Sequence, residues 1–410
     1  MRVAGDPTTE EAADARWLTR GVAGIGGASL LADLGHEVPT ALLPSFLTAT
    51  LAAPAAALGL IEGVADGLAG VMKFAGGALA DDPERRRRSA IGGYAATAVL
   101  SSLIGVTTAV WQVGLLRAGA WAARGLRVPA RNALLADVVP RSAYGRAYGF
   151  ERAMDNLGAI GGPLLALGLV ALVGVRNAML ISVVPGLLAS FAIVYAIHVT
   201  RRPTRQERRP FRVRLRPVLH GQLGRLLLGV SAFEVGNVAA TLLILRAAQL
   251  LTPQHGHNTA TKIALGLYTA YNAAATVASL WGGRLGDRRG TLLVLSLGVA
   301  LFGIAYLGLG ITGPSIATLA VFFIAAGIAI GFVETTEHAA VAEHAPIELR
   351  GSAFGALAGV QSLGNFAASG IAGLLWTTIS PRAAFTYLAA WMAIALLLLA
   401  RASHARTRPR

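Results

Sequence analysis

The sequence contains no cysteine, and charged residues make up only 14% of its 410 residues. Without cysteine there is no disulfide, no thiolate metal site and no cysteine nucleophile. Hydrophobic residues make up 54% of the chain and the mean hydropathy is +0.59, which leaves too little polar surface for an ordinary soluble protein. The composition therefore predicts a polytopic membrane protein.

Several motifs of catalysis and energy coupling are also missing. The chain has no Gly-x-x-x-x-Gly-Lys-Ser/Thr phosphate loop, no nucleophile elbow and no His/Cys metal cluster in a loop. The segments between apolar windows are too short for a catalytic domain. The sequence thus argues against an enzyme, against ATP-driven transport and against a bound cofactor.

Apolar windows long enough to cross a bilayer recur along the chain. A helix needs about 20 mostly apolar residues to cross a hydrocarbon core of about 30 Å. The windows that qualify are 20–47, 55–80, 89–109, 112–135, 145–172, 176–199, 221–250, 262–284, 290–311, 315–340, 350–377 and 381–401. Their periodicity is helical rather than that of a barrel. The expected fold class is an all-α membrane protein with 12 transmembrane helices.

Arginine is concentrated in alternate segments between these windows. One set holds Arg85 to Arg88, eight arginines between 201 and 216, Arg288, Arg289 and the last residues of the chain, whereas the other set offers only Arg176, Lys262 and Arg382. By the positive-inside rule both termini are cytoplasmic and the protein lies in the cytoplasmic (inner) membrane. The net charge of +15 then reflects membrane topology, and the basic linker is expected to contact anionic lipids. No nucleic-acid partner is expected.

One short pattern occurs twice. Gly77 to Asp81 and Gly283 to Asp287 both read Gly-x-x-x-Asp, and the two aspartates are 206 residues apart. The same offset aligns the stretch that begins at Gly125 with the stretch that begins at Gly331. The chain is therefore predicted to contain two pseudo-symmetric halves of six helices. The expected parts are a cytoplasmic tail (1–17), the first half (18–200), a basic linker (201–220), the second half (221–401) and a cytoplasmic tail (402–410).

With these features the sequence resembles the major facilitator superfamily (MFS) of secondary transporters, and in particular bacterial 12-helix proton-coupled efflux members. The family signature Gly-x-x-x-Asp-Arg-x-Gly is matched by Gly283, Asp287, Arg288 and Gly290, whereas Asp82 and Glu84 depart from it in the first copy. The resemblance implies alternating access for a small-molecule substrate, a proton gradient as the energy source and a functional monomer.

The doubled motif suggests a latch between the halves. An aspartate at a helix end can accept hydrogen bonds from the N-terminal amides of a neighbouring helix, and glycines allow close approach. By resemblance, Asp81 meets the start of the eleventh helix near Arg350, with Arg131 nearby. The alternative is that these residues only anchor loops. The candidate cytoplasmic gate comprises Gly77, Asp81, Arg131, Gly283, Asp287, Arg288 and Arg350.

Ionisable residues inside the windows are expensive in a bilayer and point to function. Asp33, His36 and Glu37 share one helix face, and Glu62, Asp66 and Lys73 form a stripe on the next helix. The offset of 206 carries that stripe onto Tyr268, Asn272 and Ser279. Two polar stripes at equivalent positions predict opposite walls of a central water-filled path.

Further charged residues extend this path. Arg117, Arg124 and Arg131 recur at heptad spacing, with Arg127 beside them. The remaining candidates for the proton and substrate pathway are Glu151, Asp155, Glu234 and Asn237. We expect a proton relay in the first half with Asp33 as its main carrier, although static ion pairs would give the same pattern. Proton uptake by Asp33 and Asp66 then depends on whether Lys73 or Arg124 lies close to these carboxylates.

The fifth window indicates a direction of transport. Gly149, Gly158, Gly162 and Pro163 resemble the antiporter motif of drug exporters, and the glycines are expected to pack this helix on the eighth. The sequence therefore predicts export of a drug-like or amphipathic metabolite. Two alternatives stay open. One is uptake by proton symport, and the other is export of a divalent metal or metal chelate through Asp33, His36 and Glu37.

Overall fold

The computed structural model describes residues 17–200 and 215–404, and within these ranges the chain forms helices and no strand. Predictions for 1–16, 201–214 and 405–410, which hold the N-terminal tail, most of the linker and most of the C-terminal tail, lie outside the described residues.

The helices of the first bundle are α2 (Arg20–Ser45) with η1 (Phe46–Thr50), α3 (Ala55–Ala80), α4 (Pro83–Leu103) with η2 (Ile104–Val106), α5 (Val110–Val138), η3 (Arg141–Ala143), α6 (Tyr144–Ile181) and α7 (Val183–Val199).

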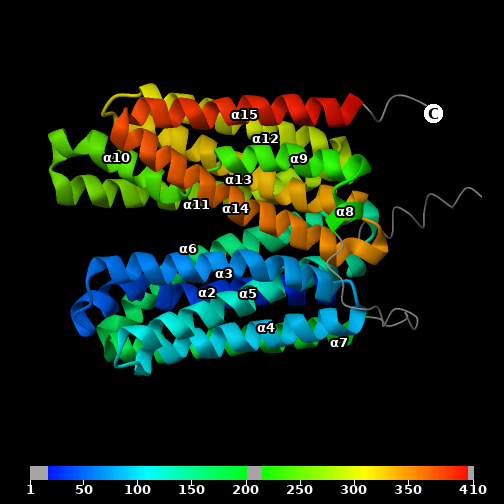
Figure 1. Ribbon diagram of the computed structural model, residues 1–410, viewed down its shortest axis with the longest axis horizontal. Helices are drawn as coiled ribbons and strands as arrows, with labels where there is room; N and C mark the ends of the chain where they lie inside the picture. Colours follow the sequence, from blue (N-terminus) through cyan, green and yellow to red (C-terminus); the bar gives the residue numbers. More distant parts are fainter. Residues whose placement is uncertain (1–16, 201–214, 405–410) are drawn as a thin grey trace, which may run out of the picture.

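The second bundle follows the short helix α8 (Leu215–Val218). It comprises α9 (Gly221–Gly236), α10 (Ala240–His255), α11 (His257–Arg289), α12 (Thr291–Ile311), α13 (Ile316–His344), η4 (Ile347–Leu349), α14 (Arg350–Thr378) and α15 (Pro381–His404). Figure 1 shows α2 to α7 in the lower part of the molecule and α9 to α15 in the upper part.

Seven stretches of the described chain are long and apolar enough to cross a membrane. One of them, Arg141–Val199, contains two helices, α6 and α7. Four further helices of 26 to 29 residues, α2, α3, α5 and α14, carry many of the polar side chains discussed below. The predicted all-α fold with twelve membrane helices is confirmed.

The seventh predicted helix differs from the expectation, because the window 221–250 is interrupted. Helix α9 ends at Gly236 and α10 begins at Ala240. The freed backbone groups find partners on neighbouring helices: the Val238 amide donates to the Tyr306 hydroxyl (3.2 Å) and the Ala239 amide to Ser369 Oγ (3.1 Å). These bonds let the chain break inside the bundle without leaving polar groups unsatisfied.

The two bundles converge toward one end, which we call the motif end because it holds Asp81 and Asp287; the opposite end is the far end. Glycines on one face of α3 measure this convergence. A Cβ atom added at Gly77 would lie 2.7 Å from the Gly351 carbonyl oxygen of α14, and one at Gly70 would lie 3.5 Å from Ser362 Cβ. At the glycines toward the far end, 59, 63 and 67, it would meet no atom within 4 Å. Helix α14 accordingly slants toward α3 in Figure 1.

Candidate functional site

Asp81 connects the two halves at the motif end. It caps the C-terminus of α3, and its carboxylate accepts hydrogen bonds from the Ser352 amide (2.8 Å) and the Ser352 hydroxyl (2.5 Å). Ser352 lies in the first turn of α14, where the helix dipole favours a negative charge. Gly77 and Gly351 allow this approach because a side chain at either position would collide with the other helix.

Asp287 makes the equivalent contact in the opposite direction. Its carboxylate accepts hydrogen bonds from the amides of Gly145 (2.6 Å) and Arg146 (3.1 Å) at the start of α6, and from Arg146 Nε (2.8 Å). A Cβ atom at Gly283 would lie 2.2 Å from the Gly145 carbonyl oxygen. Each half therefore places one aspartate on a helix N-terminus of the other half.

Three other predicted gate residues, all arginines, do not take part in the hydrogen bonds described above for Asp81 and Asp287. Arg350 donates to Asp137 Oδ1 (3.0 Å) and to the Tyr144 hydroxyl (2.5 Å), and it thus joins α14 to the first bundle. Arg288 is exposed in the last turn of α11. The Arg131 side chain pairs with Glu151 and Asp155 of α6, and its expected place near Asp81 stays a prediction.

The gate also contains residues that the sequence analysis did not assign to it. Asp137 pairs with Arg86 as well as with Arg350, and Ser352 is the partner of Asp81. The offset of 206 offered one usable signal, since it aligns Asp137 with Glu343 in the second half. Arg86 stands within a run of four arginines and is not distinguished from its neighbours by sequence.

Asp33, His36 and Glu37 form a cluster in the middle of α2. His36 Nδ1 lies 2.9 Å from the Ala32 carbonyl oxygen and 3.3 Å from Asp33 Oδ1, while His36 Nε2 lies 3.3 Å from Glu37 Oε1. Asp33 and His36 are buried and Glu37 is half-buried. A carbonyl oxygen cannot donate, so the Nδ1 atom carries a proton toward Ala32.

The glycines of α6 position this cluster. A Cβ atom at Gly158 would lie 2.8 Å from Asp33 Cβ, and one at Gly162 would lie 2.3 Å from Glu37 Cβ. Only Gly149 contacts α11 as expected, with its Cβ position 2.3 Å from the Ser279 carbonyl oxygen. The prediction that all these glycines pack on the eighth helix is therefore wrong for Gly158 and Gly162, which pack on α2. Pro163 follows them inside α6.

A second set of contacts ties α5 to α2 and α3. Arg117 donates to Glu62 (2.9 Å between Nη2 and Oε1) and to Thr40 Oγ1 (3.0 Å), and its guanidinium lies 3.4 Å from the centre of the Trp121 ring. The Trp121 indole in turn donates to Asp66 Oδ1 (2.8 Å). Glu62 and Asp66 are thus held from the same helix.

A third set joins α5 to α6. Arg131 Nη1 lies 2.7 Å from Glu151 Oε1 and 3.3 Å from Asp155 Oδ1, and it donates to Ser29 Oγ (2.8 Å). Arg152 pairs with the same two carboxylates. Arg131 and Glu151 are buried, so each depends on the charges of this four-residue set for neutralisation.

Two cations of the predicted pathway have no carboxylate within 4.0 Å among the residues described. Arg124 is half-buried, with its guanidinium 5.5 Å from the Trp121 ring. Lys73 Nζ donates to Ser362 Oγ (2.5 Å) and so bridges α3 and α14. Both charges remain available to another molecule.

The second half contributes Glu334 of α13 to the third set, because Glu334 Oε2 lies 4.0 Å from Arg152 Nη1. Glu234 accepts a hydrogen bond from Asn237 (3.0 Å) at the break after α9, and Asn272 donates to the Tyr268 carbonyl oxygen (3.0 Å) on its own helix. Within residues 17–200 and 215–404, no three histidine or acidic side chains are grouped so as to hold a metal ion.

Comparison with known proteins identifies the family. The model of the Major Facilitator Superfamily matches residues 25–254 and 230–410. The chain belongs to this superfamily. An uncharacterized MFS-type transporter of Methanocaldococcus jannaschii is 28% identical over 391 residues, which cover 94% of this chain and 95% of the relative.

Solved structures show the same MFS fold. A bacterial homologue of the iron transporter ferroportin, in an outward-facing state, has a TM-score of 0.77 at 14% identity and covers 94% of this chain and 100% of its own. The human organic anion transporter TETRAN has a TM-score of 0.72 at 16% identity and covers 93% and 99%. The chain is therefore a membrane-embedded secondary transporter of a small molecule and not an enzyme.

Proposed function

We propose that this MFS protein is a proton-coupled exporter of a drug-like or amphipathic metabolite. The observation that carries the proposal is the position of His36 between Asp33 and Glu37. Because Nδ1 carries a proton toward Ala32, Nε2 of the neutral ring has only a lone pair, which would face the Glu37 carboxylate at 3.3 Å. A proton between these two acceptors relieves the repulsion, so the pair is built to hold one.

The cluster is also placed where a change of charge affects helix packing. Asp33 lies 3.9 Å from Arg127 of α5, and both Asp33 and Glu37 touch glycines of α6. Gaining or losing a proton on α2 therefore alters the interactions of α2 with two neighbouring helices. A proton gradient can drive alternating access only if the two conformations differ in proton affinity, and such contacts supply a difference.

The arginine distribution assigns the motif end to the cytoplasm. With this orientation the contacts of Asp81 and Asp287 close the cytoplasmic side, and α3 and α14 separate toward the outside. The form described is then outward-facing, with its proton cluster behind a closed inner gate. We expect the transporter to work as a monomer whose basic linker contacts anionic lipids.

Export is favoured by the antiporter-like glycines of α6. Gly158 and Gly162 bring α6 against the proton cluster itself, which joins the motif to the coupling step. Arg124 and Lys73, which have no carboxylate within 4.0 Å among the residues described, offer a place for a substrate group to exchange with a proton. Uptake by symport would use the same proton cluster and the same cations, with proton and substrate moving in one direction. The direction of transport is therefore decided by experiment.

Metal export is the second candidate, because the fold is shared with a homologue of an iron transporter and because Asp33, His36 and Glu37 offer oxygen and nitrogen ligands. In this conformation His36 Nδ1 is engaged by the Ala32 carbonyl, which leaves only Nε2 for a cation. A metal would therefore have to bind between Nε2 and Glu37.

Transport by the purified protein in proteoliposomes tests these alternatives. Vesicles with an imposed pH gradient would be screened against amphipathic drugs, sugars and divalent metals. Gradient-dependent movement of an amphipathic compound against a proton flow supports the proposal. Movement of a divalent metal alone, or accumulation in the same direction as protons, replaces it with one of the two alternatives.

Orientation is tested separately in cells, because the chain has no cysteine of its own. A single cysteine at Gln254 should react with an impermeant maleimide from outside, and one at Gln206 only after the membrane is permeabilised. The reverse pattern would overturn the assignment of the motif end to the cytoplasm.

A further inference from the structure

One contact between helices occurs in both halves, but with different chemistry. The offset of 206 aligns Arg131 with Glu337 and Asp155 with Gln361. In the first half, Arg131 of α5 pairs with Asp155 of α6 (3.3 Å). In the second half the equivalent side chains also meet, because Gln361 Nε2 of α14 donates to Glu337 Oε1 of α13 (2.5 Å). The second half therefore keeps the contact and replaces the ion pair with an acid and an amide.

Glu337 is fully buried without an adjacent arginine or lysine. Its side chain is 0% exposed, and in the described part of the chain its Oε2 atom has no hydrogen-bond partner and no arginine or lysine nitrogen lies within 4.0 Å of its carboxyl group. Arg152 of α6 reaches toward α13, but it lies 2.9 Å from Glu151 and 4.0 Å from Glu334. The acids Glu234 and Glu334 repel a negative charge on Glu337. A carboxylate at this position would therefore have no adjacent countercharge from these side chains.

His338 does not supply the missing charge. Its Nδ1 atom lies 3.6 Å from Glu337 Oε1, which is beyond hydrogen-bond distance, and 2.6 Å from the Glu334 carbonyl oxygen. Because a carbonyl oxygen cannot donate, Nδ1 carries a proton that it gives to Glu334. The ring is buried beside the rings of Tyr148 (5.9 Å between centroids) and Phe354 (6.2 Å). A buried ion pair requires good hydrogen-bond geometry, and His338 and Glu337 do not have it.

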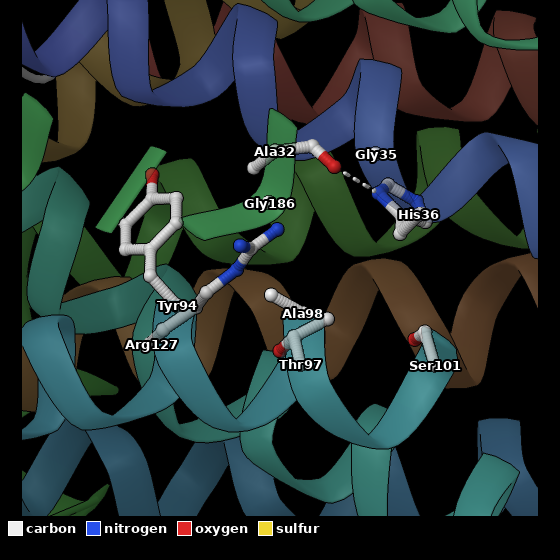
Figure 2. A pocket seen from close by; sticks show the side chains of 9 residues that line it. All are labelled: Ala32, Gly35, His36, Tyr94, Thr97, Ala98, Ser101, Arg127 and Gly186. Carbon is white, nitrogen blue, oxygen red and sulfur yellow. Dashed lines mark hydrogen bonds between the residues drawn. The ribbon is translucent and has the colours of Figure 1, made fainter. Parts of the chain in front are cut away.

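Buried acids of the first half are neutralised by arginines. Glu151 lies 2.7 Å from Arg131. Asp33 lies 3.9 Å from Arg127, a buried arginine that lines a cavity between α2, α4, α5 and α7 (Figure 2). Glu337 has no such neighbour among the residues described, so its charge must be removed in another way.

We propose that Glu337 is a proton-binding site of the second half, occupied as a neutral carboxylic acid. Its Oε1 atom is then the carbonyl oxygen that accepts from Gln361, and Oε2 carries the proton. An unpaired charge in the interior costs far more than an unpaired hydroxyl, so the proton removes the larger penalty. The acid links α13 to α14 without a charge, and this link is separate from the α2 cluster.

Infrared difference spectroscopy of the purified protein tests the site directly, because a neutral carboxylic acid and a carboxylate absorb at different frequencies. At neutral pH, Glu337→Gln should lose a neutral-acid carbonyl band that the unaltered protein shows. Glu84→Gln is the control, because Glu84 is exposed and pairs with Arg88 (2.6 Å), and it should lose carboxylate bands instead. This measurement does not depend on transport, so the inference and the proposed function can fail independently.

Two further comparisons test the surroundings of the acid. Gln361→Leu removes the donor to Oε1 and should move the neutral-acid band to higher frequency without abolishing it. Glu337→Gln has nearly the shape of the neutral acid and should leave the melting temperature unchanged. Arg131→Gln, at the equivalent position of the first half, should lower the melting temperature because it removes a charge on which Glu151 and Asp155 depend.

Three results would overturn the proposal. The first is loss of carboxylate bands in Glu337→Gln with an unchanged neutral-acid region, which would show that Glu337 is ionised. The second is a melting temperature of Glu337→Gln that falls as far as that of Arg131→Gln, which would show that a positive charge depends on Glu337. The third is stabilisation by sodium or magnesium of the unaltered protein but not of Glu337→Gln, which would replace the proton with a metal cation.

Discussion

The two halves use their polar residues differently, although one repeat relates them. In the first half, acids pair with bases on other helices, as Arg117 does with Glu62 and Arg131 with Glu151. In the second half, polar groups bond to backbone, hydroxyl or amide groups: Asn272 donates to the Tyr268 carbonyl on its own helix, and Gln361 donates to Glu337 on the neighbouring helix.

This difference separates two tasks within one fold. A proton added to the first half changes an interaction between helices, because the acid and its base lie on different helices. We therefore expect proton sensing in the first half.

The largest expected effect comes from breaking a charge pair in the first half. Arg131→Gln leaves Glu151 buried with less compensation and should lower the free energy of unfolding by about 3–5 kcal/mol. The matched change in the second half is Arg246→Gln, because Arg246 is buried and, within the described part of the chain, donates only to the carbonyl oxygens of Leu309 and Gly310. That variant should lose about 1–3 kcal/mol. Thermal or chemical unfolding in detergent measures both, and equal losses would erase the contrast between the halves.

A smaller effect is expected from crowding the proton cluster. A methyl group at Gly162 would lie 2.3 Å from Glu37 Cβ, so Gly162→Ala should displace Glu37 from His36 and cost about 1–3 kcal/mol of stability. Gly168→Ala is the control on the same helix, because no atom lies within 4 Å of its Cβ position. The first variant should reduce gradient-driven transport in vesicles and the second should not. Similar activity in both would show that the contact of α6 with α2 is irrelevant to coupling.

The smallest effect concerns the latches. Asp81→Asn and Asp287→Asn each remove a charge from a helix N-terminus, worth about 0.3–2 kcal/mol, and should shift the population toward the inward-facing form. Spin-label distances between the halves would report the shift. The two variants should act alike, because the aspartates make equivalent contacts. Unchanged distances with normal transport would reduce both residues to loop anchors.

The sequence predicted features that depend on repetition and helical period. The offset of 206 paired the two motifs, and the resemblance to the superfamily implied that Asp81 meets the start of α14, where its carboxylate accepts from Ser352. Heptad spacing put Arg117, Arg124 and Arg131 on one face of α5, but spacing along one helix does not say which neighbouring helix that face contacts, so it did not identify Glu151 and Asp155 as the partners of Arg131. The glycines of α6 were misplaced for the same reason.

Other features left no readable signal in the chain. The break after Gly236 depends on Tyr306 and Ser369, which lie far away in sequence, and an interrupted helix has the same composition as a continuous one. The cavity around Arg127 combines residues of four helices. Long-range packing decides both, and period and composition do not encode it.

We expect proton coupling to depend on the α2 cluster of the first half. Gradient-driven accumulation in proteoliposomes, compared for Asp33→Asn and Glu234→Gln, tests it most directly, because both carboxylates are buried but lie in different halves. We predict that Asp33→Asn abolishes gradient-driven accumulation while sparing substrate exchange without a gradient, and that Glu234→Gln keeps the dependence on the gradient. Full accumulation by both Asp33→Asn and Asp66→Asn would contradict the account and move the relay to Glu151, Asp155 or Glu234, or leave a uniporter.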